Sequence, residues 1–102
     1  RYLYTVFLCQ QSLEKLLKAF YLKKHEKEPP FTHNLVYLEN LTELRMEEER
    51  KHLLSELTAY YIAGRYPTYK AKLSRLVSKR RAEKLLEQTE GVFKWLRREI
   101  KS

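Results

Sequence analysis

The chain has 102 residues, a formal net charge of +8, two glycines, three prolines and one cysteine. This length favours one domain, residues 1–102, with a modest core. No run of about 18 apolar residues occurs, so we expect no membrane span. The single Cys9 excludes an intramolecular disulfide and favours a cytoplasmic location.

Positive charge is concentrated in the second half of the chain. Residues 1–64 carry nine Lys or Arg and nine Glu, whereas residues 65–102 carry twelve Lys or Arg and four Glu. A basic half of this kind attracts phosphate backbones over about 8–10 Å at ordinary salt. A solvated helical face that keeps the protein soluble is the alternative, and net charge does not separate the two.

Apolar residues at spacings of three and four predict a first helix over residues 2–27. Pro29 and Pro30 end it and predict a stiff, extended elbow. Thr32 and Asn34 can cap a second helix over residues 35–45, because their side chains accept hydrogen bonds from free amide groups. The apolar residues of these two helices are Leu3, Val6, Phe7, Leu13, Leu17, Phe20, Leu35, Leu38, Leu41 and Leu44.

A third helix is predicted over residues 47–64, where three glutamates complement the positive end of the helix dipole. Gly64 can end it in the left-handed conformation, and Pro67 prevents easy continuation. Arg65 stands between these two signals. Its planar fork suits phosphate or carboxylate binding, although an idle surface position explains it equally well.

Residues 68–77 fit either a short helical turn or an ordered loop. Ser78 then caps a final helix, and Gly91 within it costs about 1 kcal/mol of helix propensity while permitting close helix approach. The predicted inner face of this helix comprises Ala82, Leu85, Leu86, Thr89, Phe93, Leu96 and Ile100. The sequence therefore predicts an all-α, antiparallel up-and-down four-helix bundle, with a short extra helical turn before the last helix as an option.

Three polar groups call for an explanation. The stretch 10–19 places Gln11, Glu14, Lys15 and Lys18 within mutual reach on one helix, and surface ion pairs are the simplest interpretation. His33 lies between two capping residues, so a helix cap is the simplest interpretation there. The third group is residues 64–67, Gly-Arg-Tyr-Pro.

These groups, in this order, resemble the small stand-alone prokaryotic members of the HEPN domain family. The motifs are Gln10 to Ala19, Pro30 to Leu35, Tyr60 to Pro67, and Ala82 to Trp95. The resemblance implies a helical bundle that is commonly a homodimer. It also implies a minimal nucleotidyltransferase as partner, often in a toxin–antitoxin pair, and an interaction with nucleotide or RNA.

Many HEPN proteins are metal-independent ribonucleases that carry an arginine followed, after four to six residues, by a histidine. No histidine follows Arg65 at that spacing. Arg45 and His52 have the spacing, but they lie between the second and third helices. The resemblance therefore leaves enzymatic activity open.

Three hypotheses follow. The first is a module that binds nucleotide or RNA phosphate. The second is an RNA-cleaving toxin in which Arg65 stabilises charge and His33 acts as acid or base. The third is a structural dimerisation module. We expect no cofactor and no metal, because the chain has three histidines, one cysteine and no aspartate, and no histidine pair has zinc-site spacing. The residues expected at a phosphate site are Arg65, Tyr66, Lys15, Lys18, Glu14 and His33.

Overall fold

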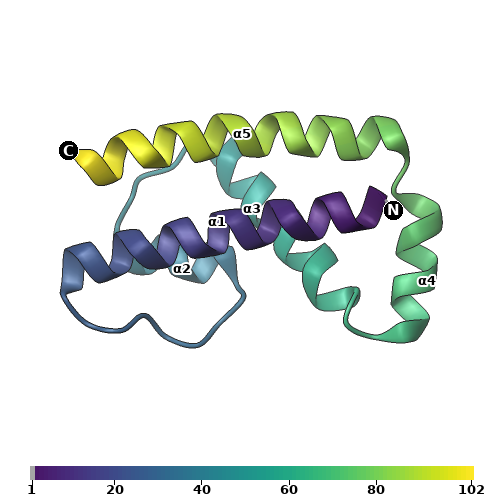
Figure 1. Ribbon diagram of the computed structural model, residues 1–102, viewed down its shortest axis with the longest axis horizontal. Coiled ribbons are helices and arrows are strands. Elements are labelled where there is room, and N and C mark those ends of the chain that lie inside the picture. The colour runs from purple at the N-terminus through teal and green to yellow at the C-terminus, as the bar shows by residue number, and fades with distance from the viewer. Residues whose placement is uncertain (1) are drawn as a thin grey trace.

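Leucine side chains from four helices fill the core of the protein. The computed structural model describes residues 2–102, which form five helices: α1 (Tyr2–His25), α2 (Leu35–Thr42), α3 (Glu48–Ala63), α4 (Pro67–Leu76) and α5 (Lys79–Lys101) (Figure 1). The predicted all-α bundle is confirmed. The leucines that are fully buried are Leu13, Leu17, Leu35, Leu38, Leu54, Leu57, Leu85 and Leu96.

Helices α1, α2 and α5 run in one direction, and α3 runs in the other. The last turn of α1 meets the last turn of α5, where Lys23 Nζ donates to the carbonyl of Ile100. It also meets the end of α2, where His25 Nε2 lies 3.0 Å from the carbonyl oxygen of Leu41. The strictly alternating order expected from the sequence is therefore wrong for these three helices (Figure 1).

The segment 26–34 explains this parallel order, because it returns along the bundle without forming a helix. Glu26 adopts a positive φ of 53° and ends α1 at His25, two residues before the predicted end. Pro29 and Pro30 then keep the chain extended. Nine extended residues span about 30 Å, enough to reach back to the middle of α1.

The predicted caps are confirmed at two helices. Asn34 Oδ1 accepts from the backbone N–H of Tyr37 at 3.1 Å, and Ser78 Oγ accepts from that of Arg81 at 3.1 Å. Helix α2 is shorter than expected, because Glu43 adopts the left-handed conformation, with φ 59°. These bonds satisfy amide groups that each helix start leaves free.

Gly64 directly follows the last residue of α3, but not in the predicted conformation. Its φ is −68°, so the expected left-handed conformation is wrong. A Cβ atom built on Gly64 would lie 2.2 Å from Cζ of Phe7 and 3.0 Å from the carbonyl oxygen of Tyr60. The absence of a side chain thus lets α1 and the end of α3 approach closely.

The segment after Gly64 forms helix α4, which resolves the choice between a helical turn and a loop. Pro67 is its first residue, a position where proline sacrifices no hydrogen bond. None of the residues of α4 is buried. The helix lies across one end of the bundle and connects α3 to α5 (Figure 1).

The predicted inner face of α5 is correct at most positions, including Ala82, Leu85 and Leu96. Leu86 is 42% exposed, and Val92 is buried instead. Gly91 makes no close helix contact, because a Cβ atom there would meet nothing within 4 Å. In the described part of the chain, no helix is both long and apolar enough to cross a bilayer.

The two glycines should respond oppositely to replacement by alanine. We expect Gly64→Ala to lower the free energy of unfolding by about 1–2 kcal/mol, because its methyl group overlaps Phe7. We expect Gly91→Ala to raise it by about 0.5–1 kcal/mol, because alanine favours an open helical position. Urea unfolding of both variants measures the difference. A Gly64→Ala protein as stable as the wild type would contradict the Phe7 contact.

Candidate functional site

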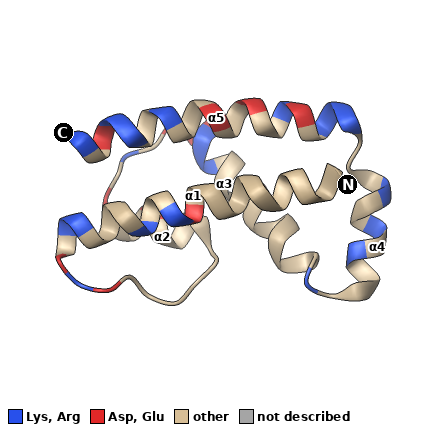
Figure 2. Cartoon of the chain, in the orientation of Figure 1, with Lys and Arg blue, Asp and Glu red and all other residues tan. Residues whose placement is uncertain are grey.

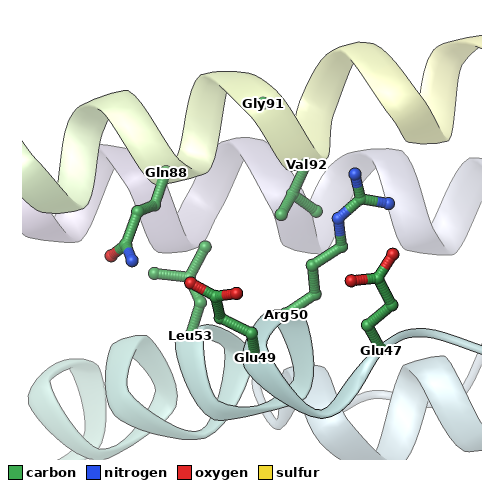
Figure 3. A pocket seen from close by; sticks show the side chains of 7 residues that line it. All are labelled: Glu47, Glu49, Arg50, Leu53, Gln88, Gly91 and Val92. Atoms are coloured by element: carbon green, nitrogen blue, oxygen red, sulfur yellow. The ribbon is translucent and has the colours of Figure 1, made fainter.

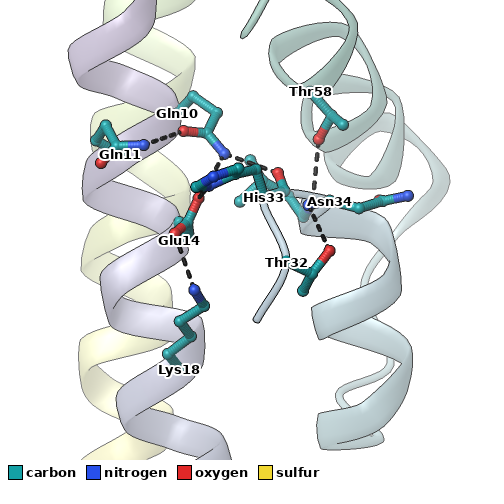
Figure 4. Close-up of polar contacts among 9 residues, drawn as sticks. Gln10, Gln11, Glu14, Lys18, Thr32, His33, Asn34 and Thr58 are labelled. Atoms are coloured by element: carbon teal, nitrogen blue, oxygen red, sulfur yellow. Dashed lines mark hydrogen bonds and ion pairs between the residues drawn. The ribbon is translucent and has the colours of Figure 1, made fainter. Parts of the chain in front are cut away.

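A buried amide on α1 holds the segment that carries His33. Gln10 is 0% exposed and lies on the apolar stripe between Val6 and Leu13. Its Nε2 donates to Glu14 Oε1 at 3.0 Å and to the carbonyl oxygen of His33 at 2.8 Å (Figure 4). Gln11 Nε2 donates to Gln10 Oε1 at 2.8 Å. The burial of Gln10 is therefore compensated by bonds to both ends of its amide.

Glu14 orients the imidazole of His33. His33 Nδ1 lies 2.8 Å from Glu14 Oε1, and Lys18 Nζ donates to Glu14 Oε2 at 3.0 Å (Figure 4). Because a carboxylate oxygen only accepts, Nδ1 carries the proton in this pair. Nε2 of His33 is then left to accept from, or donate to, a ligand.

The hydrogen bonds around Glu14 keep it ionised. Burial by itself raises the pKa of this carboxyl group, but bonds from Gln10, His33 and Lys18, together with the charge of Lys18, outweigh burial. The pKa of Glu14 therefore lies below its ordinary value. At neutral pH the group is a fixed negative charge with both oxygens occupied.

Two aromatic rings lie beside His33, and a further hydrogen bond holds the segment that carries it. Its ring lies 5.0 Å from that of Tyr61 on α3 and 5.7 Å from that of Phe31, measured between centroids. The backbone N–H of Leu35 donates to Thr58 Oγ1 at 3.1 Å (Thr58 also shown in Figure 4). The His33 segment is thus tied to α1 on one side and to α3 on the other.

The remaining predicted site residues lie outside this cluster. Arg65 and Tyr66 are exposed at the junction of α3 and α4, and Lys15 is exposed on α1. The ring of Tyr66 meets Tyr69 edge-on, with centroids 6.4 Å apart. Within residues 2–102, the side chains of Arg65 and Lys15 have no hydrogen bond or ion pair. Arg65 lines none of the cavities described below.

The structure therefore unites three of the six predicted residues: Glu14, Lys18 and His33. Gln10 is not among the predicted site residues, although its position in the apolar stripe marks it as a buried polar residue that needs partners. Tyr61 is not among them either, and its half-buried ring contacts His33. No local pattern could have revealed that contact.

A cavity of about 250 Å³ lies between the start of α3 and the middle of α5 (Figure 3). Its lining includes Glu47, Glu49, Arg50 and Leu53. The guanidinium of Arg50 lies 4.8 Å from the ring centroid of Trp95, a cation–π distance. None of the predicted site residues lines this cavity, and its mixed charges favour no particular ligand.

A groove of about 580 Å³ runs between α1 and α5, with a mainly apolar lining that includes Leu8, Leu86 and Phe93. Cys9 lies at its base, and burial raises the pKa of its thiol despite an opposing contact with Thr89. The thiol is therefore protonated at neutral pH. No group of three or more His, Cys or Glu side chains within residues 2–102 is arranged to hold a metal ion.

Comparison with known proteins agrees with the helical architecture and the ordered motifs. The family model of the HEPN domain matches residues 1–100. The chain belongs to the HEPN domain family. No curated protein and no solved structure gives a significant match.

Arg45 and His52, which have the spacing of the ribonuclease motif, lie around the start of α3. Arg45 lies in the link between α2 and α3, and His52 lies on α3. Both side chains are exposed, and neither has a hydrogen-bond partner in the described part of the chain.

Removal of the Glu14 charge should destabilise the domain in a pH-dependent way. Because the folded pKa of Glu14 is lowered, its stabilising effect is present above the unfolded pKa and is lost as pH falls through the folded pKa. We expect Glu14→Gln to lower the free energy of unfolding by about 1–3 kcal/mol at pH 7. The difference in this free energy between variant and wild type should become smaller below about pH 4.5.

Urea unfolding at several pH values measures this gap. Glu87→Gln is the matched control, because Glu87 is exposed on α5 and has no partner within residues 2–102. A gap that stays constant from pH 7 to pH 3 would contradict the assigned role of Glu14.

Proposed function

We propose that this HEPN domain binds phosphate groups of a nucleotide or of RNA, and that it acts as a homodimer together with a minimal nucleotidyltransferase in a toxin–antitoxin type system. The exposed, unpaired guanidinium of Arg65 is the observation that supports phosphate binding most. Residues 57–82 contain seven Lys or Arg and no acidic residue. A guanidinium in such surroundings presents its planar fork to phosphate oxygens.

Glu14 leaves Arg65 available for a ligand. Its two carboxylate oxygens already accept from Gln10, His33 and Lys18. Its ion pairs are with Lys18 and His33, and none joins it to Arg65 within residues 2–102.

Tyr61 contacts His33 and lies close to Arg65 in the sequence. Its ring lies 5.0 Å from that of His33, and Arg65 follows it by four residues. The backbone N–H of Arg65 donates to the carbonyl of Ile62 at 3.2 Å, in the turn that follows α3.

The groove between α1 and α5 supports the homodimer. Leu8 and Leu86 are about half exposed along it, at 52% and 42%. Glu90 lies in the same groove as Lys94 and Arg97. A two-fold axis across this face would place the acidic residue of one copy opposite the basic residues of the other, while burying the leucines.

Removal of the Arg65 side chain should weaken phosphate binding. We expect Arg65→Ala to reduce affinity for ATP or a short RNA by about tenfold at low salt, the loss expected for a charge-assisted hydrogen bond. Fluorescence anisotropy with labelled ligands measures the change. Arg45→Ala is the control, because Arg45 is exposed in the link between α2 and α3, away from α4 (Figure 1). Equal affinities of Arg65→Ala and wild type would contradict the proposal.

RNA cleavage is the second candidate, and the Glu14–His33 pair favours it. The carboxylate fixes the imidazole tautomer and leaves Nε2 free for proton transfer, as a general acid or base requires. Arg65 would stabilise the negative charge that develops on the phosphate. The geometry requires both side chains to reach one phosphate, within one chain or across a dimer.

This second candidate predicts a loss of cleavage, with binding retained, when the imidazole is removed. Incubation of the purified protein with several RNAs, in the presence of a metal chelator, tests for activity. We expect His33→Gln to lower any cleavage rate by about 10²-fold or more. Intact RNAs after prolonged incubation with the wild type would exclude cleavage and leave the phosphate-binding proposal standing.

A further inference from the structure

Helix α4 contributes little to the core. None of its residues is buried, and only Leu73 packs partly against the core cluster. Large apolar and aromatic side chains remain in solvent on this helix and at Tyr66, which caps its start: Tyr66 is 59% exposed, Tyr69 55% and Leu76 75%. Several exposed rings and apolar chains on one short element are typical of a surface that binds a partner.

The same helix is positively charged without compensation. It carries Lys70, Lys72 and Arg75, and α5 begins with Lys79 and Arg80. Basic residues follow α4 into the first turn of α5, and no acidic residue lies on α4 (Figure 2). Among residues 57–82 as the structure describes them, Arg81 alone forms an ion pair, with Glu56. The surface therefore attracts a polyanion.

Aromatic rings lie between these charges. Tyr66 and Tyr69 meet edge-on, and Lys72 Nζ lies 5.9 Å from the ring centroid of Tyr69. A cavity of about 200 Å³ separates α4 from the start of α1, and its lining includes Tyr4 and Lys70. Tyr4 is itself 65% exposed. Rings beside cations offer both stacking surfaces and phosphate contacts within a short distance.

We infer that α4 binds single-stranded RNA, with bases stacked on Tyr69 and Tyr66 and with phosphates on Lys70, Lys72 and Arg75. This inference rests on the proposed phosphate-binding function and specifies its ligand. A mononucleotide fits less well, because each cation stands on open surface, where a single exposed ion pair contributes little. A duplex fits less well, because its base faces are already stacked. Only an unpaired strand uses the charges and the rings together.

The test compares two sets of α4 variants with a control that removes the same charge. Lys70→Gln/Lys72→Gln/Arg75→Gln removes three cations from α4, and Lys84→Gln/Arg98→Gln/Lys101→Gln removes three exposed cations from α5 that lie outside the groove with α1. Tyr69→Ala removes one ring, and Tyr69→Phe keeps it. Anisotropy with a labelled 12-nucleotide RNA, single-stranded or as a duplex, is measured between 50 and 200 mM salt.

We expect the α4 charge variant to bind the single strand at least tenfold more weakly and to flatten the salt dependence by about two log–log units. The α5 variant should change affinity by less than threefold. Tyr69→Ala should weaken binding about tenfold with an unchanged salt slope, and Tyr69→Phe should match the wild type. The duplex should bind more weakly than the single strand. Circular dichroism should show the same helix content in all variants, since α4 buries no side chain.

Four results would overturn the inference: equal losses from the α4 and α5 charge variants, no effect of Tyr69→Ala, tighter binding of the duplex, or competition by polyglutamate as strong as by RNA. The last result would identify an acidic protein as the partner. If Arg65→Ala weakens RNA binding while the α4 variants bind normally, the result supports the proposed phosphate binding and contradicts the inference about α4. If the wild type binds neither ATP nor RNA, both proposals fall.

Discussion

A buried amide and a buried carboxylate on α1 determine where the extended segment 26–34 can lie. Gln10 and Glu14 occupy positions of the apolar stripe, and burial of such groups is tolerated only when their polar atoms find partners. The backbone and ring of His33 supply those partners. The segment 26–34 must therefore return to the middle of α1, and α2 must start there.

The ion pairs of Glu14 and Glu56 also determine which basic residues have acidic partners. Glu14 is paired with His33 and Lys18, and Glu56 is paired with Arg81; within residues 2–102 neither forms an ion pair with a basic residue of α4. Arg65 and the cations of α4 then remain without acidic partners in the described chain. The domain presents His33, which Glu14 orients (Figure 4) and whose ring contacts that of Tyr61. Beyond the end of α3 it presents a basic helix (Figure 2), on which the side chain of Tyr69 is exposed. In the proposed function, phosphate recognition uses these two features together.

Much of the local structure could be predicted from short patterns. Asn34 and Ser78 cap their helices as expected, because a capping side chain bonds to an amide only two or three residues away. The apolar stripe of α1 and the excess of positive charge in residues 65–102 could also be predicted from the sequence. For the site, Glu14, Lys18 and His33 were identified as residues, but Gln10 and the ring of Tyr61 were not, since their roles depend on contacts with His33 across 23 and 28 residues of chain.

The sequence by itself determined where most helices lie, where they end and which residues cap them. It also determined the motifs that mark the family and the positive charge of residues 65–102. Each depends on neighbours within about one helical turn or on composition alone. The tertiary structure alone decided the parallel course of α1 and α5, the contact of Gly64 with Phe7, the pairing of Glu14 with His33 and the exposure of Arg65. These depend on the path of the extended segment 26–34 and on which distant side chains satisfy the buried polar atoms, and no local pattern encodes either.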